Sequence, residues 1–130
     1  MECQDCGGVT EPFTVPETYR AYVPGQEPAV SICTRCLSMY PVVEPPEGDP
    51  DFSRVSDAFP LNPDGEIAFA LLVGLLENLA LYRSEITELL IAVEESGTDP
   101  LLALDRLASD PGIETGLDLS GRRRQLEQLL

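Results

Sequence analysis

The chain contains 130 residues, with 23 acidic side chains against 8 basic ones and a formal net charge of −15 at pH 7. It contains no histidine, and every basic residue is an arginine because no lysine is present. The lack of histidine excludes a histidine general base, a histidine-containing triad and a catalytic zinc with imidazole ligands.

The acidic residues are spread along the whole chain. Residues 1–50 contain eight acids and two arginines, and residues 51–130 contain fifteen acids and six arginines. A disordered acidic tail would concentrate its charge in one block, whereas this pattern is typical of a globular protein in very high salt. We therefore expect an extremely halophilic host; the competing interpretation is an acidic surface that binds a basic partner. In molar salt counterion release contributes little, so the acidity does not exclude a nucleic-acid partner.

The sequence shows no signal peptide, and its longest apolar run, residues 67–76, is about half as long as a membrane span. We expect a soluble, cytoplasmic protein with no membrane partner. In such a protein, closely paired cysteines favour metal binding over disulfide bonds.

The first motif along the chain is a matched set of two Cys-x-x-Cys pairs. These pairs contain all four cysteines of the chain: Cys3, Cys6, Cys33 and Cys36. Each pair forms one knuckle, and the residues between the pairs allow both knuckles to close on one tetrahedral ion. Four thiolates leave no open position for water, so the pattern predicts a structural Zn(2+) and no enzymatic activity. Thiol redox chemistry, a rubredoxin-like iron site and disulfide bonds are the alternatives.

The residue that follows each pair differs between the two knuckles. Gly7 follows the first pair, and glycine tolerates the positive-φ turn that a knuckle favours. Leu37 follows the second pair, so the second knuckle departs from the symmetric pattern.

Short strands are expected around the knuckles. The stretch 9–15 alternates loosely between apolar and polar residues, and Pro12 within it indicates an edge position. Residues 16–22 could form one helical turn, and residues 29–32 and 37–43 lead into and out of the second knuckle. A module of about 40 residues buries too little surface to fold alone, so the metal must supply stability.

A proline-rich connector, residues 44–50, follows this module and excludes regular structure. Phe52, Val55 and Phe59 then have the spacing of a single helical turn that attaches the connector to the rest of the chain.

The remainder is expected to be helical. One helix, apolar on nearly every side, begins at Ile67 and ends at Leu81, and is either core or an interface. The next begins with Ser84 as its cap and is ended by Gly97. The third begins with Asp99 as cap and Pro100 in its first turn, and a stripe of Leu101, Leu104 and Ala108 marks its apolar side. The last helix runs from about Ser120 to Leu130 and contains Leu126 and Leu129.

The N-terminal segment, residues 1–43, resembles a zinc ribbon. The whole chain also resembles a haloarchaeal family of uncharacterised small acidic proteins, in which a CxxCG…CTxCL module precedes an apolar helical domain. The matching stretches are residues 3–7, 33–37, 51–60 and 99–106. This resemblance implies a fold and a host but no assigned activity.

Together these patterns predict an α+β protein with a zinc-ribbon-like β module at 1–43, a connector at 44–50 and a helical bundle at 51–130. We expect a non-enzymatic, zinc-stabilised interaction module that binds another macromolecule, most readily a protein. The alternatives are a nucleic-acid-associated factor of transcription or the ribosome, and an electron-transfer or thiol redox protein. A second copy of the chain could associate through the apolar helix that begins at Ile67.

Two groups of side chains bear on the nucleic-acid alternative. Phe13, Tyr19, Tyr22 and Arg20 are the stacking and basic groups between the knuckles, which is few for a strand-binding face. The one basic run, Arg122, Arg123 and Arg124, is expected to pair with the chain's own carboxylates, for example Arg123 with Glu127.

Overall fold

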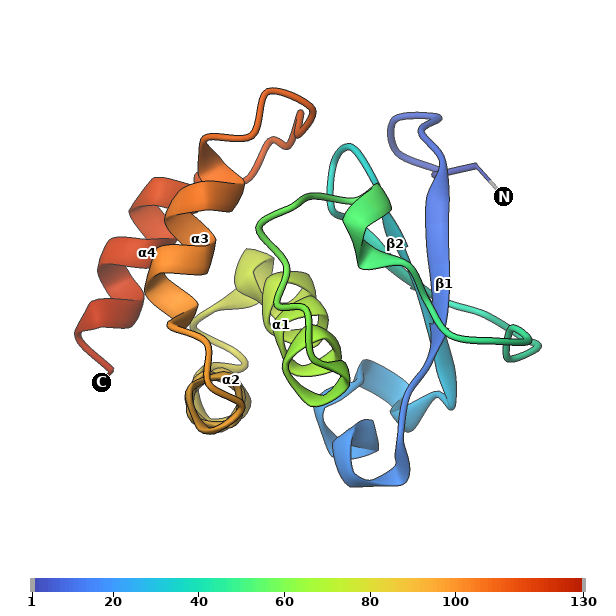
Figure 1. Ribbon diagram of the computed structural model, residues 1–130, viewed down its shortest axis with the longest axis horizontal. Helices are drawn as coiled ribbons and strands as arrows, with labels where there is room; N and C mark the ends of the chain where they lie inside the picture. Colours follow the sequence, from blue (N-terminus) through green and yellow to red (C-terminus); the bar gives the residue numbers. More distant parts are fainter. Residues whose placement is uncertain (1, 130) are drawn as a thin grey trace.

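The computed structural model describes residues 2–129 and has mixed α and β architecture. A three-stranded antiparallel sheet lies at one end of the molecule, and helices α3 (Pro100–Ala108) and α4 (Leu119–Glu127) lie at the other (Figure 1). Helix α1 (Pro63–Leu75) lies between them and packs against α2 (Arg83–Glu95). Among residues 2–129, no helix has the length and apolar content needed to cross a bilayer.

The sheet has the strand order β1-β2-β3, with β1 at Thr10–Thr14, β2 at Ala29–Cys33 and β3 at Met39–Pro41. Strands β1 and β3 lie within the predicted stretches 9–15 and 37–43, and β2 extends one residue beyond the predicted 29–32, to Cys33. Pro12 lies on β1, at an edge of the sheet, as expected for a residue that lacks a backbone donor. Every residue of the central strand β2 is buried, so neither of its faces is left to solvent.

The segment between β1 and β2 contains two short 3-10 helices, η1 (Glu17–Tyr22) and η2 (Pro24–Gln26). The predicted helical turn at 16–22 is therefore confirmed. Pro16 immediately precedes the turn, and its fixed φ prepares the chain to enter it.

The connector, residues 44–50, contains neither helix nor strand, as predicted. It leads into a 3-10 turn, η3 (Phe52–Arg54), where the Asp51 side chain caps the turn by accepting a hydrogen bond from the Ser53 amide. Phe52, Val55 and Phe59 are all buried, which confirms that this turn attaches the connector to the core.

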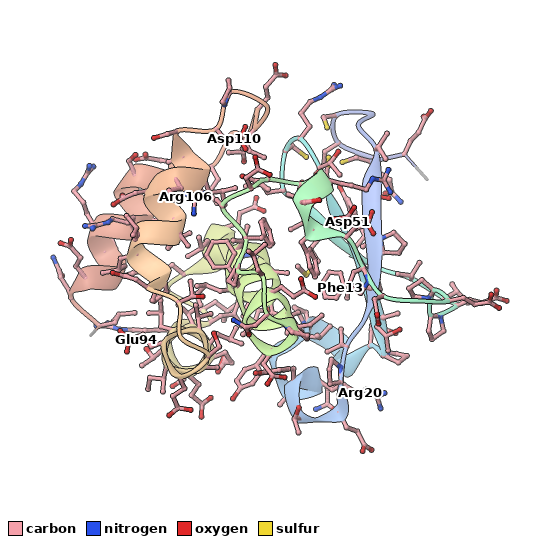
Figure 2. All side chains as sticks on the ribbon, viewed as in Figure 1. Phe13, Arg20, Asp51, Glu94, Arg106 and Asp110 are labelled. Carbon is pink, nitrogen blue, oxygen red and sulfur yellow. The ribbon has the colours of Figure 1, made fainter. Side chains whose placement is uncertain are left out.

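All four phenylalanines of the chain form one line through the interior. Phe13 on β1 contacts Phe52 edge to face with centroids 5.1 Å apart, Phe52 stacks on Phe59 at 5.3 Å, and Phe59 meets Phe69 on α1 at 5.0 Å. The buried side chains between sheet and helices belong to one continuous core (Figure 2). The β module and the helices therefore share their hydrophobic interior.

The apolar helix ends earlier than predicted. Helix α1 stops at Leu75, and a 3-10 turn, η4 (Leu76–Asn78), follows, so the prediction of a helix to Leu81 is wrong. The Asn78 carbonyl accepts hydrogen bonds from the amides of both Leu81 and Tyr82, which turns the chain toward α2, and Leu81 is 72% exposed. Nine residues of α1 are buried in the chain's own core, so an association of two copies through this helix would require that core to open.

Of the four predicted signals at helix ends, Gly97, Asp99 and Pro100 are confirmed and Ser84 is not. Gly97 adopts φ +100° immediately after Ser96, the C-cap of α2, and Asp99 caps α3 with Pro100 as its first residue. The prediction of Ser84 as a cap is wrong, because α2 begins at Arg83 and Tyr82 precedes it without a side-chain cap. Asp118 caps α4, one residue before its start at Leu119. The predicted residue Leu130 lies outside the described residues.

The buried side of α3 also differs from the predicted stripe. Ala103, Leu104 and Leu107 are buried, whereas Ala108 is exposed and Leu102 is 57% exposed. Helix α4 packs along α3, so the row that faces this neighbour is the buried one.

A buried carboxylate attaches the connector to the sheet. Glu11 on β1 is 7% exposed. Its Oε2 accepts a hydrogen bond of 3.0 Å from the Asp51 amide, and its Oε1 accepts one of 2.8 Å from the Arg54 guanidinium. Because the Arg54 side chain is itself 52% exposed, the ion pair is partly screened and the amide contact matters most.

Replacing Glu11 with alanine should lower the free energy of unfolding by about 1–3 kcal/mol, since it leaves the Asp51 amide without its acceptor. Chemical denaturation measures this loss. The matched control is Glu17→Ala at an exposed position, which should change stability by less than about 0.5 kcal/mol. Equal effects of the two substitutions would show that the Glu11 contacts are not stabilising.

Candidate metal centre

The four cysteines of the two knuckles come together at one end of the sheet. Their sulfurs all lie within 4.8 Å of one another; Cys3 Sγ is 3.6 Å from Cys36 Sγ, and Cys6 Sγ is 3.5 Å from Cys33 Sγ. A tetrahedral ion with metal–sulfur bonds of about 2.3 Å places its sulfurs about 3.8 Å apart. The cluster therefore has the donor set and the dimensions to hold one metal ion.

The two knuckles have matching backbone geometry. The Cys3 amide donates to the Gly8 carbonyl at 2.7 Å, and the Cys33 amide donates to the Ser38 carbonyl at 2.8 Å, five residues on in both cases. Gly7 has φ +77°, and Leu37 at the equivalent position has φ +68°. A leucine thus adopts the left-handed conformation that favours glycine, and its side chain is 4% exposed, so burial offsets the backbone strain.

Backbone amides point at the sulfurs. The Asp5 amide lies 3.4 Å from Cys3 Sγ, and the amides of Arg35 and Cys36 lie 3.4 Å from Cys33 Sγ. Such N–H donors stabilise negative charge on sulfur, which is the form that binds a metal.

A polar side chain connects the two knuckles. The Ser38 hydroxyl donates to Asp5 Oδ2 at 2.8 Å, and its oxygen lies 3.2 Å from Cys36 Sγ. The Tyr40 hydroxyl and the Ser38 hydroxyl hold the pKa of Asp5 below its ordinary value. These contacts orient the ligands from outside the sulfur cluster.

The thiols differ in their pKa values. Burial raises the pKa of Cys33 and raises that of Cys36 to about 12. Burial also opposes ionisation of Cys3, but hydrogen bonds from the Cys6 and Asp5 amides and the neighbouring thiols outweigh it and lower the pKa to about 7.

The cysteine spacing predicted the four ligands but not the roles of Gly8, Asp5 and Ser38 beside them. A Cβ on Gly8 would lie 3.2 Å from Cys33 Sγ and 3.3 Å from Cys6 Sγ, so glycine leaves room for the sulfurs. The second of two consecutive glycines was the one local signal for this position. Asp5 and Ser38 become recognisable only when the knuckles are brought together.

A groove of about 1020 Å³ lies beside the cysteine cluster, and we call it the knuckle groove. Its walls come from both knuckles, from β3, from the end of α1 with η4, and from residues 114–118. Gly74 allows β3 to approach, because a Cβ there would lie 2.6 Å from the Met39 methyl carbon. The Glu114 amide donates to the Arg35 carbonyl at 2.8 Å, which ties the second knuckle to the segment before α4.

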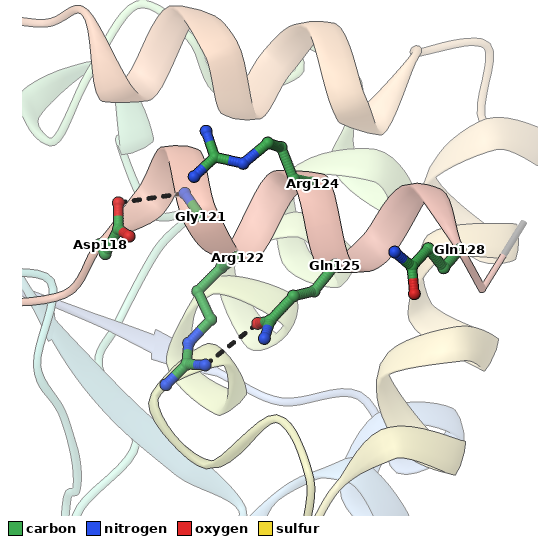
Figure 3. Close-up of a pocket in the computed structure, with 6 residues that line it drawn as sticks. All are labelled: Asp118, Gly121, Arg122, Arg124, Gln125 and Gln128. Carbon is green, nitrogen blue, oxygen red and sulfur yellow. Dashed lines mark hydrogen bonds between the residues drawn. The ribbon is translucent and has the colours of Figure 1, made fainter.

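The basic run lies on α4, and its first residue, Arg122, also lines the knuckle groove. Arg123 pairs with Glu127, as predicted, and its Nε lies 3.1 Å from Asp105 Oδ1. Arg122 donates to Gln125 Oε1 at 3.1 Å and Arg124 is exposed; both line a surface pocket on this helix (Figure 3). The expectation of pairing with carboxylates is thus met by Arg123, whereas the hydrogen bonds of Arg122 go to neutral acceptors.

Replacing Gly8 with alanine should weaken metal affinity by about one order of magnitude, because a crowded Cβ costs about 1–3 kcal/mol. Competition between the protein and a chelator for Co²⁺ or Zn²⁺ measures the affinity. Gly116→Ala is the matched control, since no atom lies within 4 Å of its added Cβ. Unchanged affinity in G8A would contradict the close approach of this residue to the sulfurs.

Metal affinity should fall as the pH is lowered. Binding must remove protons from Cys33 and Cys36, whose pKa values are raised by burial, so metal binding at pH 7 releases at least about two protons per ion. Calorimetric titration in two buffers of different ionisation enthalpy counts these protons. A pH-independent affinity between pH 6 and about pH 8 would rule out thiols as the ligands.

The chain is similar to a known protein family over nearly its whole length. No curated protein and no solved structure is significantly similar to the chain. Residues 2–130 match the model of a family of unknown function, DUF6276, and the chain therefore belongs to this family.

Proposed function

We propose that the chain is a non-enzymatic interaction module in which a zinc-ribbon-like β module holds one structural zinc ion and the knuckle groove binds a basic segment of another protein. The cysteine cluster supports the first part, because four thiolates saturate a tetrahedral zinc and leave no position for a substrate. Zinc is favoured over iron because one knuckle lacks the glycine typical of rubredoxin-like sites and no tryptophan is present.

The observation that carries the proposal is the position of the knuckle groove. A volume of about 1020 Å³ is at the upper end for ligand sites, and one wall is formed by Cys6 and Cys36 themselves. Metal binding therefore acts directly on the shape of this wall. The Arg35–Glu114 hydrogen bond extends the effect to residues 114–118, which also line the knuckle groove.

The charges in the knuckle groove favour a protein partner over a nucleic acid. Four carboxylates line it, from Asp5, Glu77, Glu114 and Asp118, against one arginine, Arg122. This lining attracts lysine or arginine side chains and repels phosphates. Apolar lining from Leu37 and Met39 supplies contact area for such a segment.

The stacking and basic groups between the knuckles give little support to a strand-binding face. Phe13 is fully buried, and Arg20, which donates to the Val15 carbonyl, lies far from the sulfurs (Figure 2). The pKa of Tyr19 is raised by burial and by the nearby carboxylates of Asp64 and Glu95. A phosphate backbone would meet the same negative charge there.

The acidity of the whole chain is, in this proposal, an adaptation to high salt. Three ion pairs are formed among the described residues, and two of them share Arg123, so most carboxylates have no cationic partner. Concentrated salt screens the repulsion between exposed carboxylates that lie far apart, whereas charges in direct contact within the knuckle groove are screened much less.

The proposal is tested by a photo-crosslinking amino acid at two surface positions of the full-length chain, in cells of its own host. At Asn78, which lines the knuckle groove, we expect crosslinks to a protein with a basic segment. At Glu94, on the exposed side of α2 (Figure 2), we expect none, which makes it the matched control.

Charge reversal sharpens this test. Glu77→Arg combined with Glu114→Arg should abolish the Asn78 crosslink while leaving metal content unchanged, because neither side chain is a metal ligand. Crosslinks to RNA or DNA at Asn78, or equal crosslinking from both positions, would refute the proposed partner class.

A further inference from the structure

We propose that oxidation of the cysteine cluster expels the metal and joins the two knuckles through the disulfides Cys3–Cys36 and Cys6–Cys33. The proposal rests on the structural zinc proposed above and concerns the regulation of the same site. Its basis is the pairing of sulfurs across the knuckles at 3.6 and 3.5 Å, each pair with one thiol from each knuckle.

The exposure of the cysteine residues predicts the order in which they are oxidised. Cys6 is exposed, whereas Cys33, whose Sγ lies 3.5 Å from Cys6 Sγ, is fully buried. A peroxide therefore reaches Cys6 first and converts its thiolate to a sulfenic acid, with release of hydroxide. Cys33 Sγ, 3.5 Å away, then attacks this sulfur; the S–S bond forms, the S–O bond breaks and a second hydroxide leaves.

The remaining pair follows the same course once two ligands are lost. Cys36 is half-buried and Cys3 buried, so the second pair becomes accessible as the ion departs. The balanced reaction consumes one tetrathiolate zinc site, two hydrogen peroxide molecules and four protons. It produces two disulfides, one Zn²⁺ and four water molecules, with four electrons passing from sulfur to peroxide.

Pairing across the knuckles preserves the fold of the module. The Cys6–Cys33 and Cys3–Cys36 links join residues 27 and 33 positions apart, so each closes the hairpin that the metal closed before. Links within a knuckle, Cys3–Cys6 and Cys33–Cys36, would leave the two knuckles unconnected. In the oxidised chain the two knuckles therefore remain joined without a metal.

The electrical charge of the knuckle groove changes with this conversion. A zinc ion with four thiolates carries two negative charges, whereas two disulfides carry none. Cys6 and Cys36 both line the knuckle groove, so oxidation removes this negative charge from one wall. Affinity for a basic segment should fall accordingly.

The experiment treats zinc-loaded, full-length protein with hydrogen peroxide and follows two signals. A zinc-responsive dye should report complete loss of one ion per chain. Peptide mapping by mass spectrometry should find Cys3 linked to Cys36 and Cys6 linked to Cys33, with a mass about 4 Da below that of the reduced, metal-free chain. Retention of zinc, links within each knuckle, or sulfinic acids in place of disulfides would overturn the proposal.

Two variants separate the pairs. C3S/C36S retains Cys6 and Cys33 and should form a disulfide rapidly, whereas C33S/C36S retains Cys3 and Cys6 of one knuckle and should form it at least about tenfold more slowly. Circular dichroism selects conditions in which both variants remain folded, because unfolding would favour the link between the nearer residues Cys3 and Cys6. Equal rates in the folded variants would contradict the preference for pairing across the knuckles.

Zinc content and disulfide pairing test the two proposals separately. If the purified chain contains no zinc, the structural zinc fails, yet disulfide mapping of the metal-free chain still tests the pairing. If zinc is present and the disulfides form within each knuckle, the redox inference alone fails.

Discussion

The line of four phenylalanines is the contact on which the rest of the structure depends. Phe13 belongs to the sheet and Phe69 to α1, and the two intermediate rings come from the segment that follows the connector. Offset and edge-to-face ring contacts add stabilisation beyond the area that they bury. A sheet of three short strands is marginal by itself, so its stability comes from this contact with α1 as much as from any metal. The cysteine cluster then completes one end of a core that extends into the helices.

The cluster is coupled to both halves of the chain. Glu11 holds the connector on β1, and the Arg35–Glu114 hydrogen bond reaches from the second knuckle to the segment before α4. Residues from 5 to 122 therefore line a single knuckle groove. A binding surface made from segments so far apart in sequence exists only in the folded chain. Its shape then depends on every contact that positions these segments, including those of the sulfurs.

Short-range sequence signals predict much of this arrangement. The predictions fail where contacts between residues far apart in the sequence determine the structure. The cysteine spacing predicted the cluster, and Asp99-Pro100 and Gly97 correctly marked helix ends because their effects are local. The end of α1 depends on hydrogen bonds to the Asn78 carbonyl, and the buried side of α3 depends on α4. The phenylalanine line has no period in the sequence, since its members lie at positions 13, 52, 59 and 69. The conformation of Leu37 was likewise hidden, because leucine gives no local indication of a positive φ.

The full burial of β2 has a consequence for how the hairpin finds its alignment. In a strand with one wet face, a slip by one residue exposes apolar side chains and is strongly penalised. Here all five residues of β2 are buried, so hydrophobic alternation discriminates weakly between the native pairing of Thr10 with Cys33 and a shifted one. Cys33 belongs to this pair and Cys36 follows it in the chain, so a slip would displace both residues relative to Cys3 and Cys6. The four cysteines can bind one metal ion together only when the strands pair in the native register. Metal binding therefore favours the native register during folding, in addition to stabilising the folded protein.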